Sequence, residues 1–264
     1  MKRRKRIALV TGATRGLGLA IVEELAGLNH HVLLTGRDVE KGYVEAGSFQ
    51  RKGFDVRFLE LDVCDERSAE NLALVVRDQY GALDVIVNNA AVCLEEWSSS
   101  ALTNCLEVNF FGAVRTVACL GQLLAKDACI LNVSSGDGES VWFSTAVRER
   151  FEGVQSTNAL LDALRDFAEK ADAVPPEEVV HGEQPTYKVS KFALNCYTRL
   201  LHNDLNESGI RVLSVCPGDV RTRMNPSASR SPSDAAKAIA ELVVGGPSTY
   251  QSGSFFRDRE VISW

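Results

Sequence analysis

Tyr187 and Lys191 stand four residues apart in the segment Thr186–Lys191. On a helix, side chains with this spacing project from one face, one turn apart. A phenol has a pKa of about 10 and is a poor proton donor at neutral pH, but a nearby ammonium stabilises the phenolate and lowers that pKa. Tyr187 could then protonate a carbonyl oxygen as hydride arrives at the carbon. The same spacing also occurs on ordinary amphipathic helices, so its meaning depends on the elements around it.

A glycine-rich turn lies near the start of the chain, between a strand-like and a helix-like segment. The apolar run Arg6–Thr11 predicts a buried parallel strand, and Leu19–Ala26 has the periodicity of a helix. Glycines between them allow a tight turn and close backbone approach, while the helix N-terminus offers N–H groups to a pyrophosphate. The alternative is a chance loop with three glycines. We predict a dinucleotide phosphate site made of Gly12, Thr14, Arg15, Gly16, Leu17 and Gly18.

The end of the second strand, His31–Arg37, indicates which dinucleotide binds. An acidic residue there would bind the ribose 2′-OH of NAD, whereas an arginine favours the 2′-phosphate of NADP. Asp38 would serve NAD, but it is better explained as the N-cap of the next helix. Arg37 and Arg15 can converge on a phosphate, with about 1.5–3 kcal/mol for each charge-assisted bond. The sequence therefore favours NADPH/NADP+, and NAD less.

Strands and helices alternate along most of the chain. Further strands are predicted at 56–61, 83–87, 128–133 and 210–216, with a short last strand near 253–256. Helices are expected at about 65–80, through Asn109 to about 125, from Tyr187 to about 207, and from Ser233, as N-cap, to 244. This repetition predicts a single-domain, Rossmann-like α/β fold over residues 1–264, with a doubly wound parallel sheet of about seven strands.

Residues 138–185 interrupt the alternation. Thr157–Ala171 carries apolar residues at helical spacing, and Pro175-Pro176 ends that helix. The segment is too periodic for a disordered linker. We expect a helical insertion directly before Tyr187, beside the site.

Composition excludes several classes of function. The 264 residues have a net charge of −6, which favours neither nucleic acid nor an anionic membrane as a partner. The basic run Lys2–Arg6 fits a localisation or membrane-surface signal, but a solvated tail is the preferred interpretation. No apolar run has the length of a membrane span. Seven scattered cysteines without a C-x-x-C predict a reducing, cytoplasmic location, and neither cysteines nor histidines have metal-ligand spacing.

Taken in order, these residues resemble the short-chain dehydrogenase/reductase family over essentially the whole chain. The matching motifs are Thr11-Gly-x-x-x-Gly-x-Gly18, Asp62-Val63, Asn88-Asn89-Ala90, Asn109, Asn132-Val133-Ser134-Ser135, Tyr187-x-x-x-Lys191 and Pro217-Gly218-x-x-x-Thr222. The resemblance implies NAD(P)-dependent oxidoreduction. It also implies further cofactor contacts from Asp62, Val63, Asn89, Ala90, Tyr187, Lys191, Pro217, Gly218, Val220 and Thr222.

The resemblance assigns a role to four residues. Ser135 would hydrogen-bond the substrate carbonyl and Tyr187 would donate the proton. Lys191 would bind the nicotinamide ribose and tune Tyr187, and Asn109 would orient a water in the proton relay. Ser135 is preferred to Ser134 because the second serine of the family motif is usually catalytic, and because alternation along a strand lets only one face the site.

The long insertion resembles that of the monomeric NADPH-dependent carbonyl reductases, where it covers the tyrosine helix that most relatives bury between subunits. This implies a monomer that reduces a small-molecule ketone, aldehyde or quinone. Ala91 departs from the family, which usually has glycine there, and its methyl could crowd the cofactor or alter the turn. Two alternatives stay open: a catalytically idle NADP-binding sensor or scaffold, and an alcohol dehydrogenase working in the oxidative direction.

Overall fold

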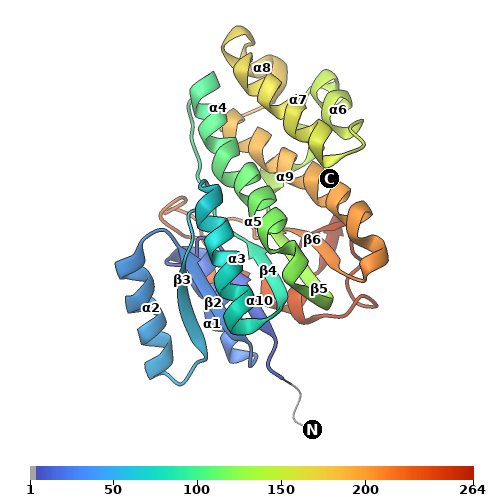
Figure 1. Ribbon diagram of the computed structural model, residues 1–264. Coiled ribbons are helices and arrows are strands. Elements are labelled where there is room, and N and C mark those ends of the chain that lie inside the picture. Colours follow the sequence, from blue (N-terminus) through green and yellow to red (C-terminus); the bar gives the residue numbers. More distant parts are fainter. Residues whose placement is uncertain (1–3) are drawn as a thin grey trace.

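The structure is a computed structural model that describes residues 4–264. Its strands form one sheet in the order β3-β2-β1-β4-β5-β6-β7-β8 (Figure 1). Seven strands run parallel, and β8 pairs antiparallel with β7. The winding reverses between β1 and β4, the place where open α/β sheets bind ligands. The bounds are β1 Ile7–Val10, β2 His31–Gly36, β3 Val56–Glu60, β4 Leu83–Asn88, β5 Leu124–Val133, β6 Arg211–Cys216, β7 Ser254–Arg257 and β8 Glu260–Ile262.

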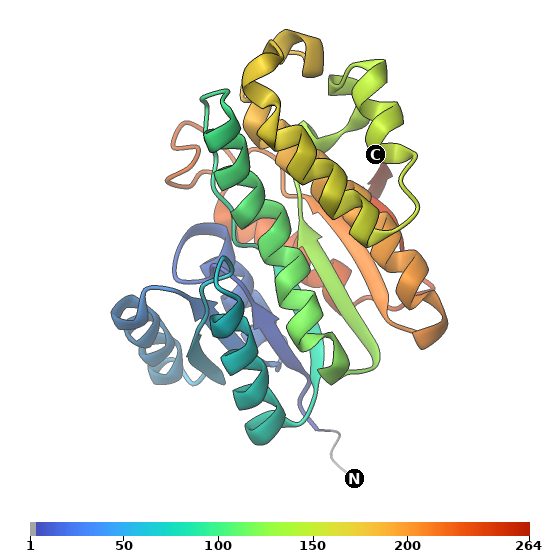
Figure 2. The ribbon, with the colours of Figure 1, turned by 45° about the horizontal axis from the view of Figure 1, so that its top comes forward.

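Helices cover both faces of the sheet, which confirms the predicted doubly wound α/β fold (Figures 1 and 2). The main helices are α1 Gly16–Gly27, α2 Val39–Arg51, α3 Glu66–Tyr80, α4 Ser99–Leu106, α5 Gly112–Leu120, α9 Pro185–Leu205 and α10 Pro232–Val244. One face shares its core with α1, α2 and α10, and the other with α3, α4, α5 and α9. Within residues 4–264, no helix is both long and apolar enough to cross a bilayer.

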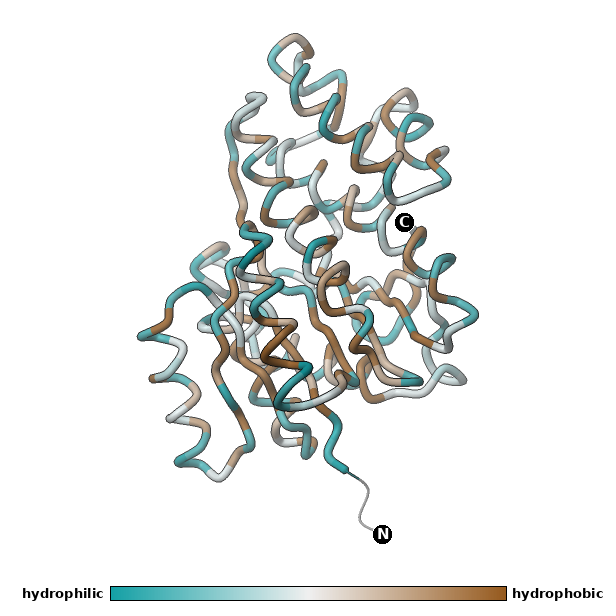
Figure 3. The backbone as a smooth tube through the Cα atoms, in the orientation of Figure 1, coloured by the Kyte–Doolittle hydropathy of each residue, from teal (hydrophilic) through white to brown (hydrophobic). Residues whose placement is uncertain are grey.

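Successive residues of the central strands point to opposite faces of the sheet. In β1, Ala8 and Val10 lie in the core on the α1 side, whereas Leu9 lies in the core on the α3 side. Cys129 of β5 is also buried among hydrophobic side chains, as expected for a cysteine that acts as a small hydrophobe. Because both faces are covered, the central strands contain long apolar stretches, which are brown in Figure 3.

The helix expected to run to about residue 125 is shorter and interrupted. α4 gives way to a π-helical segment, η1 (Glu107–Phe111), and α5 ends at Leu120. After a short turn, β5 begins at Leu124, which pairs with Leu83. Leu124 therefore belongs to the strand, and its half-buried side chain packs against the core of the sheet. Apolar periodicity alone does not separate a helix end from a buried strand start.

Two differences lie near the C-terminal end. α10 begins at Pro232 and is capped by Ser231, whose Oγ accepts the Asp234 N–H at 3.1 Å, and not by Ser233. A proline at the first helical position is favourable, and it moves the cap one residue before itself. β8 was not expected, because its three residues include exposed Glu260 and lack a strand pattern. It follows a tight turn in which Asp258 has φ +55°.

The segment 138–185 is helical, as predicted, and covers the outer side of α9 (Figures 1 and 2). It contains α6 Thr145–Glu152, α7 Thr157–Glu169 and α8 Pro176–Val179. Phe143 stacks on Phe192 of α9, with ring centroids 4.4 Å apart. Phe151 of α6 packs edge-on against Phe192 and against Phe167 of α7. The insertion therefore shares one hydrophobic core with α9.

Part of the basic N-terminal run is ion-paired. Arg4 makes two contacts with the Asp84 carboxylate, at 2.7 and 3.0 Å, and Lys5 contacts Asp55 at 2.9 Å. Lys2 and Arg3 lie outside the described residues. The described part of the run leads straight into β1, in keeping with the preferred interpretation, and the signal interpretation stays a prediction.

If the insertion and the sheet form one cooperative unit, a cavity inside the insertion should weaken the whole chain. Phe151 is only 2% exposed, and Phe151→Ala should lower the free energy of unfolding by about 3–5 kcal/mol. Urea denaturation should still give one transition by circular dichroism and tryptophan fluorescence. Val141→Ala, at a side chain 69% exposed, is the matched control and should change stability by less than about 0.5 kcal/mol. A separate early transition in the Phe151 variant would make the insertion an independent unit.

Candidate active site

Hydrogen bonds join the carboxyl ends of β1 and β4 where the winding of the sheet reverses. Thr11 Oγ1 accepts the backbone N–H groups of Asn89 and Ala90, each at 3.0 Å, and Asn89 Nδ2 donates to the Thr11 carbonyl at 2.9 Å. Gly12 has φ +62°, and a Cβ there would lie 2.7 Å from the Ala90 Cα. Glycine lets the turn approach β4 this closely. The link that Thr11 makes between β1 and β4 was not predicted from the sequence, although a hydroxyl at the end of a strand could have indicated it.

The start of α1 presents backbone N–H groups to this edge of the sheet. α2, α3 and α10 each begin with a capping side chain, from Asp38, Asp65 and Ser231. Among the described residues, none caps the first turn of α1, which follows Arg15. An uncapped N-terminus has N–H donors and a positive dipole end for an anion. The predicted glycine turn therefore fits a pyrophosphate.

The loop after β6 folds against the same turn. Gly16 has φ +57°, and a Cβ on it would lie 3.5 Å from the Thr222 methyl group. Gly218 has φ +74°, and Arg230 Nη1 donates to the Pro217 carbonyl at 3.0 Å. The loop is thus anchored at its start and meets the glycine turn at its end. It carries four predicted cofactor residues, Pro217, Gly218, Val220 and Thr222.

The end of β2 has a basic rather than an acidic character. A Cβ on Gly36 would lie 2.9 Å from the Thr14 methyl group, so the glycine turn and the end of β2 are neighbours. Arg15 and Arg37 are both exposed here, and neither forms an ion pair within residues 4–264. Asp38 caps α2 by accepting the Lys41 N–H at 3.1 Å. Asp38 is therefore the N-cap of α2, as predicted. The guanidinium groups of Arg15 and Arg37 are available to bind a phosphate.

Asp62 and Val63 form the turn directly after β3. Asp62 Oδ1 accepts the Cys64 N–H at 3.0 Å, and Arg115 donates to the Val63 carbonyl. A Cβ on Gly112 of α5 would lie 2.9 Å from the Val63 side chain. These contacts fix the turn at the carboxyl edge of the sheet, on the same side as the glycine turn.

Tyr187 and Lys191 lie together on α9, as the spacing predicted. Lys191 Nζ lies 5.6 Å from the centroid of the Tyr187 ring. The same ammonium donates to the Val133 carbonyl at the end of β5, at 2.8 Å, and Lys191 is only 2% exposed. α9 is thereby tied to the strand that carries Ser134 and Ser135.

The pKa of Tyr187 is raised, whereas the sequence predicted that Lys191 would lower it. Burial raises the pKa of Tyr187 above its ordinary value, the Asp137 carboxylate adds to the rise, and the Ser135 hydroxyl opposes it. Burial also lowers the pKa of Lys191, to about 8. A desolvated ammonium that is easily deprotonated stabilises a phenolate weakly. Tyr187 therefore stays protonated at neutral pH, which is the form that a proton donor needs.

The two serines after β5 point in different directions. Ser134 is buried and its Oγ donates to the Lys191 carbonyl at 3.3 Å. Ser135 is partly exposed, and its Oγ donates to Asp137 Oδ2 at 3.2 Å. Of the two, Ser135 is the more exposed, and its contact with a substrate stays a prediction. Asp137 was missed, although a carboxylate between two glycines directly after the serine pair was a usable signal.

Asn109 sits in the π-helical segment η1 and links three elements. Its Oδ1 accepts the Val92 N–H at 2.8 Å, and its Nδ2 donates to the Val92 carbonyl and to Ser190 Oγ, both at 2.8 Å. The side chain thus ties the loop after β4 to α9. Its predicted contact with a water stays a prediction. Ala91 does not have a positive φ, so the methyl that replaces the usual glycine imposes no left-handed strain on this loop.

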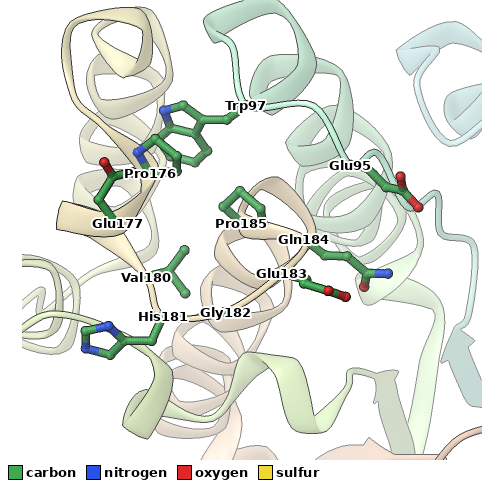
Figure 4. Close-up of a pocket in the computed structure, with 10 residues that line it drawn as sticks. All are labelled: Glu95, Trp97, Pro176, Glu177, Val180, His181, Gly182, Glu183, Gln184 and Pro185. Atoms are coloured by element: carbon green, nitrogen blue, oxygen red, sulfur yellow. The ribbon is translucent and has the colours of Figure 1, made fainter.

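A cavity of about 630 Å³ opens beside the first turn of α9 (Figure 4). Figure 4 shows that its walls come from the loop after β4, from the insertion and from the start of α9. Its lining reaches Pro185, two residues before Tyr187. The volume is that of a typical small-molecule pocket, about 300–1,000 Å³. Apolar walls come from Trp97, Val180 and Pro185, and carboxylates from Glu95, Glu177 and Glu183.

Known proteins resemble the chain along its full length. Carbonyl reductase (NADPH) 1 from Sus scrofa is 32% identical over 285 residues, covering 100% of this chain and 96% of the relative. Carbonyl reductase (NADPH) 3 from Homo sapiens is 32% identical, with 98% of both chains covered. Among solved structures, salutaridine reductase from Papaver somniferum is 25% identical and superposes with a TM-score of 0.87 over 96% of this chain and 100% of that one. Menthone neomenthol reductase from Mentha piperita is 26% identical, with a TM-score of 0.82 over 98% of this chain and 100% of that one.

The family model described as short chain dehydrogenase matches residues 6–147 and 178–233. The unmatched stretch between them lies inside the insertion. The matched segments contain the glycine turn, the serine pair, Tyr187 and Lys191. The chain belongs to the short-chain dehydrogenase family.

Proposed function

We propose that the protein is an NADPH-dependent carbonyl reductase that reduces a ketone, aldehyde or quinone. The observation that carries this proposal is the joint placement of Ser135, Tyr187 and Lys191 at the edge of the sheet where the glycine turn lies. Two carbonyl reductases that match the chain over its whole length support the same class of reaction. An idle sensor would have no use for this set of proton-handling side chains.

NADPH, when bound, supplies the hydride, and the residues of the chain handle the proton and the geometry. Tyr187 is protonated at neutral pH, so its hydroxyl can donate to the carbonyl oxygen as negative charge develops there. Ser135 donates a second hydrogen bond to that oxygen, turning from Asp137 toward the substrate. Two preorganised donors stabilise the developing charge more than they stabilise the neutral carbonyl.

The preference for NADPH rests on the basic end of β2. Arg15 and Arg37 are exposed beside the glycine turn, while Asp38 is used as a helix cap. The uncapped first turn of α1 suits the pyrophosphate. Gly12 has no side chain, so the turn can pack against Ala90 at the end of β4. Together these features support NADPH as the cofactor, with NADH less favoured.

The insertion supports two further proposals. Its cavity beside the start of α9 would take the part of the substrate that extends beyond the carbonyl. Because the insertion packs over the outer side of α9, that helix face is not free for a second subunit, which supports a monomer. The scattered cysteines support a cytoplasmic location.

Removal of the Tyr187 hydroxyl tests the proton donor. Tyr187→Phe should lower kcat for carbonyl reduction at least about 100-fold, because general acid catalysis is lost, and should leave the Kd of NADPH within about twofold. Stopped-flow NADPH oxidation and fluorescence titration measure the two quantities. Tyr197→Phe is the matched control, since Tyr197 lies buried on the same helix, and it should keep near-normal kcat. Undiminished turnover in Tyr187→Phe would refute the assignment.

Charge reversal at the end of β2 tests the cofactor preference. Arg37→Asp should shift the ratio of kcat/KM for NADPH over NADH toward NADH by about 10- to 100-fold, the equivalent of one lost charge-assisted bond. Steady-state rates with both cofactors give the ratio. Arg51→Asp, at the far end of α2, controls for net charge and should leave the ratio unchanged. An unaltered ratio in Arg37→Asp would assign the preference to Arg15 or to another group.

A further inference from the structure

We propose that Asp137 is a positioning residue for this reaction: its turn places the Ser135 hydroxyl, and its carboxylate, paired with Lys188, sets the charge that acts on the Tyr187 phenol. The proposal rests on the proposed function, because it names residues that govern the proton donor of that site.

The turn that carries Asp137 makes two contacts with Ser135. Ser135 Oγ accepts the Asp137 backbone N–H and donates to Asp137 Oδ2, each at 3.2 Å. A serine hydroxyl has one proton and two acceptor positions, so both its proton and one acceptor position are used by a single residue. Asp137 therefore fixes the place of the Ser135 oxygen through its N–H, and its carboxylate holds the Ser135 proton until a carbonyl oxygen takes over as acceptor.

The same turn is seated on α9 and does not move independently of it. A Cβ on Gly138 would lie 2.8 Å from the Lys191 carbonyl, and Asn195 Nδ2 donates to the Gly138 carbonyl at 3.0 Å. Ser134 Oγ makes a further contact with the Lys191 carbonyl. Asp137 is thus held at a fixed place relative to Tyr187 and Lys191.

Lys188 holds the second oxygen of the carboxylate. Its Nζ lies 3.3 Å from Asp137 Oδ1, and its side chain is only 7% exposed. The ammonium also donates to the Glu183 carbonyl and lies 5.3 Å from the centre of the Trp142 ring. A buried lysine with three such neighbours cannot swing away at little cost. Lys188 therefore both fixes and partly neutralises Asp137.

Asp137 is the carboxylate among the groups that act on Tyr187, and it adds to the larger effect of burial on the pKa of the phenol. Its surroundings comprise the Lys191 ammonium, the thiols of Cys93 and Cys105, and the Asp137 carboxylate. Burial raises the pKa of Cys93 to about 11 and also raises the pKa of Cys105, so both thiols are neutral near pH 7. A phenolate next to Asp137 would place two negative charges together, which disfavours it. Asp137 therefore raises the pH at which Tyr187 ionises.

This account predicts opposite effects for the two halves of the ion pair. Asp137→Asn removes the negative charge at nearly constant size, so Tyr187 should ionise at lower pH. Lys188→Gln leaves Asp137 unbalanced, so Tyr187 should ionise at higher pH. Damage to the structure alone would not shift the two variants in opposite directions.

The experiment follows kcat/KM for NADP+-dependent oxidation of an alcohol against pH, because the profile reports the ionisation of the base in the free enzyme. The alcohol is the product of the best carbonyl substrate of the wild-type enzyme. Asp137→Asn should shift the rising limb of the profile to lower pH by roughly one unit, and Lys188→Gln should shift it to higher pH. Lys188→Arg keeps the charge and should restore the wild-type limb. Glu139→Gln is the matched control, since Glu139 lies in the same loop but pairs with Arg257 at 2.7 Å, and it should cause no shift.

A second measurement needs no turnover. Ultraviolet absorbance of the phenolate is titrated in each variant with and without Tyr187→Phe, and the difference isolates Tyr187. The same opposite shifts are expected, and identical titrations in Asp137→Asn, Lys188→Gln and the wild type would overturn the proposal. If the wild type reduces no carbonyl compound, the proposed function fails, while this titration still decides the role of Asp137. If Asp137→Asn does not fold, comparison of Lys188→Gln with Lys188→Arg tests the same effect of charge on the ionisation of Tyr187.

Discussion

A buried ammonium beside a buried phenol is the constraint on which the site depends. Lys191 Nζ sits 5.6 Å from the Tyr187 ring centre and donates to the Val133 carbonyl at 2.8 Å. A carbonyl dipole compensates a desolvated charge only in part, so the pKa of the ammonium falls to about 8. Burial acts on the phenol in the opposite sense and keeps its proton in place. The pair therefore presents a protonated phenol at the site, provided that the surrounding structure holds both groups in place.

That support comes from both faces of α9. On the inner face, Asn195 bridges the Gly138 carbonyl and Ser214 Oγ of β6, at 3.0 and 2.8 Å. Toward the loop after β4, Ser190 Oγ receives a hydrogen bond from Asn109. On the outer face, the insertion stacks Phe143 on Phe192. Helix, strand ends and insertion thus form one framework around the proton donor, so exposure of α9 to solvent would loosen the whole site.

Much of this organisation could be predicted from the sequence. Apolar runs located the seven parallel strands, and the polar residues after them marked the ligand edge, because parallel strands place their carboxyl ends together. The spacing of Tyr187 and Lys191 predicted their contact. The direction of the pKa of Tyr187 could not be predicted, since it depends on burial and on Asp137, which only the folded chain brings there. Thr11 and the π-helical setting of Asn109 were missed for the same reason: local patterns do not contain long-range hydrogen bonds.

The central claim is that Tyr187 passes its proton to the carbonyl oxygen while hydride reaches the carbon. The most direct measurement is the single-turnover rate of NADPH oxidation, with protium or deuterium at the transferred position, in H2O and in D2O. If both transfers belong to one step, each deuterium slows that step and the solvent effect persists with deuterated cofactor. A rate that is the same in H2O and D2O would place the proton transfer outside that step and contradict the account.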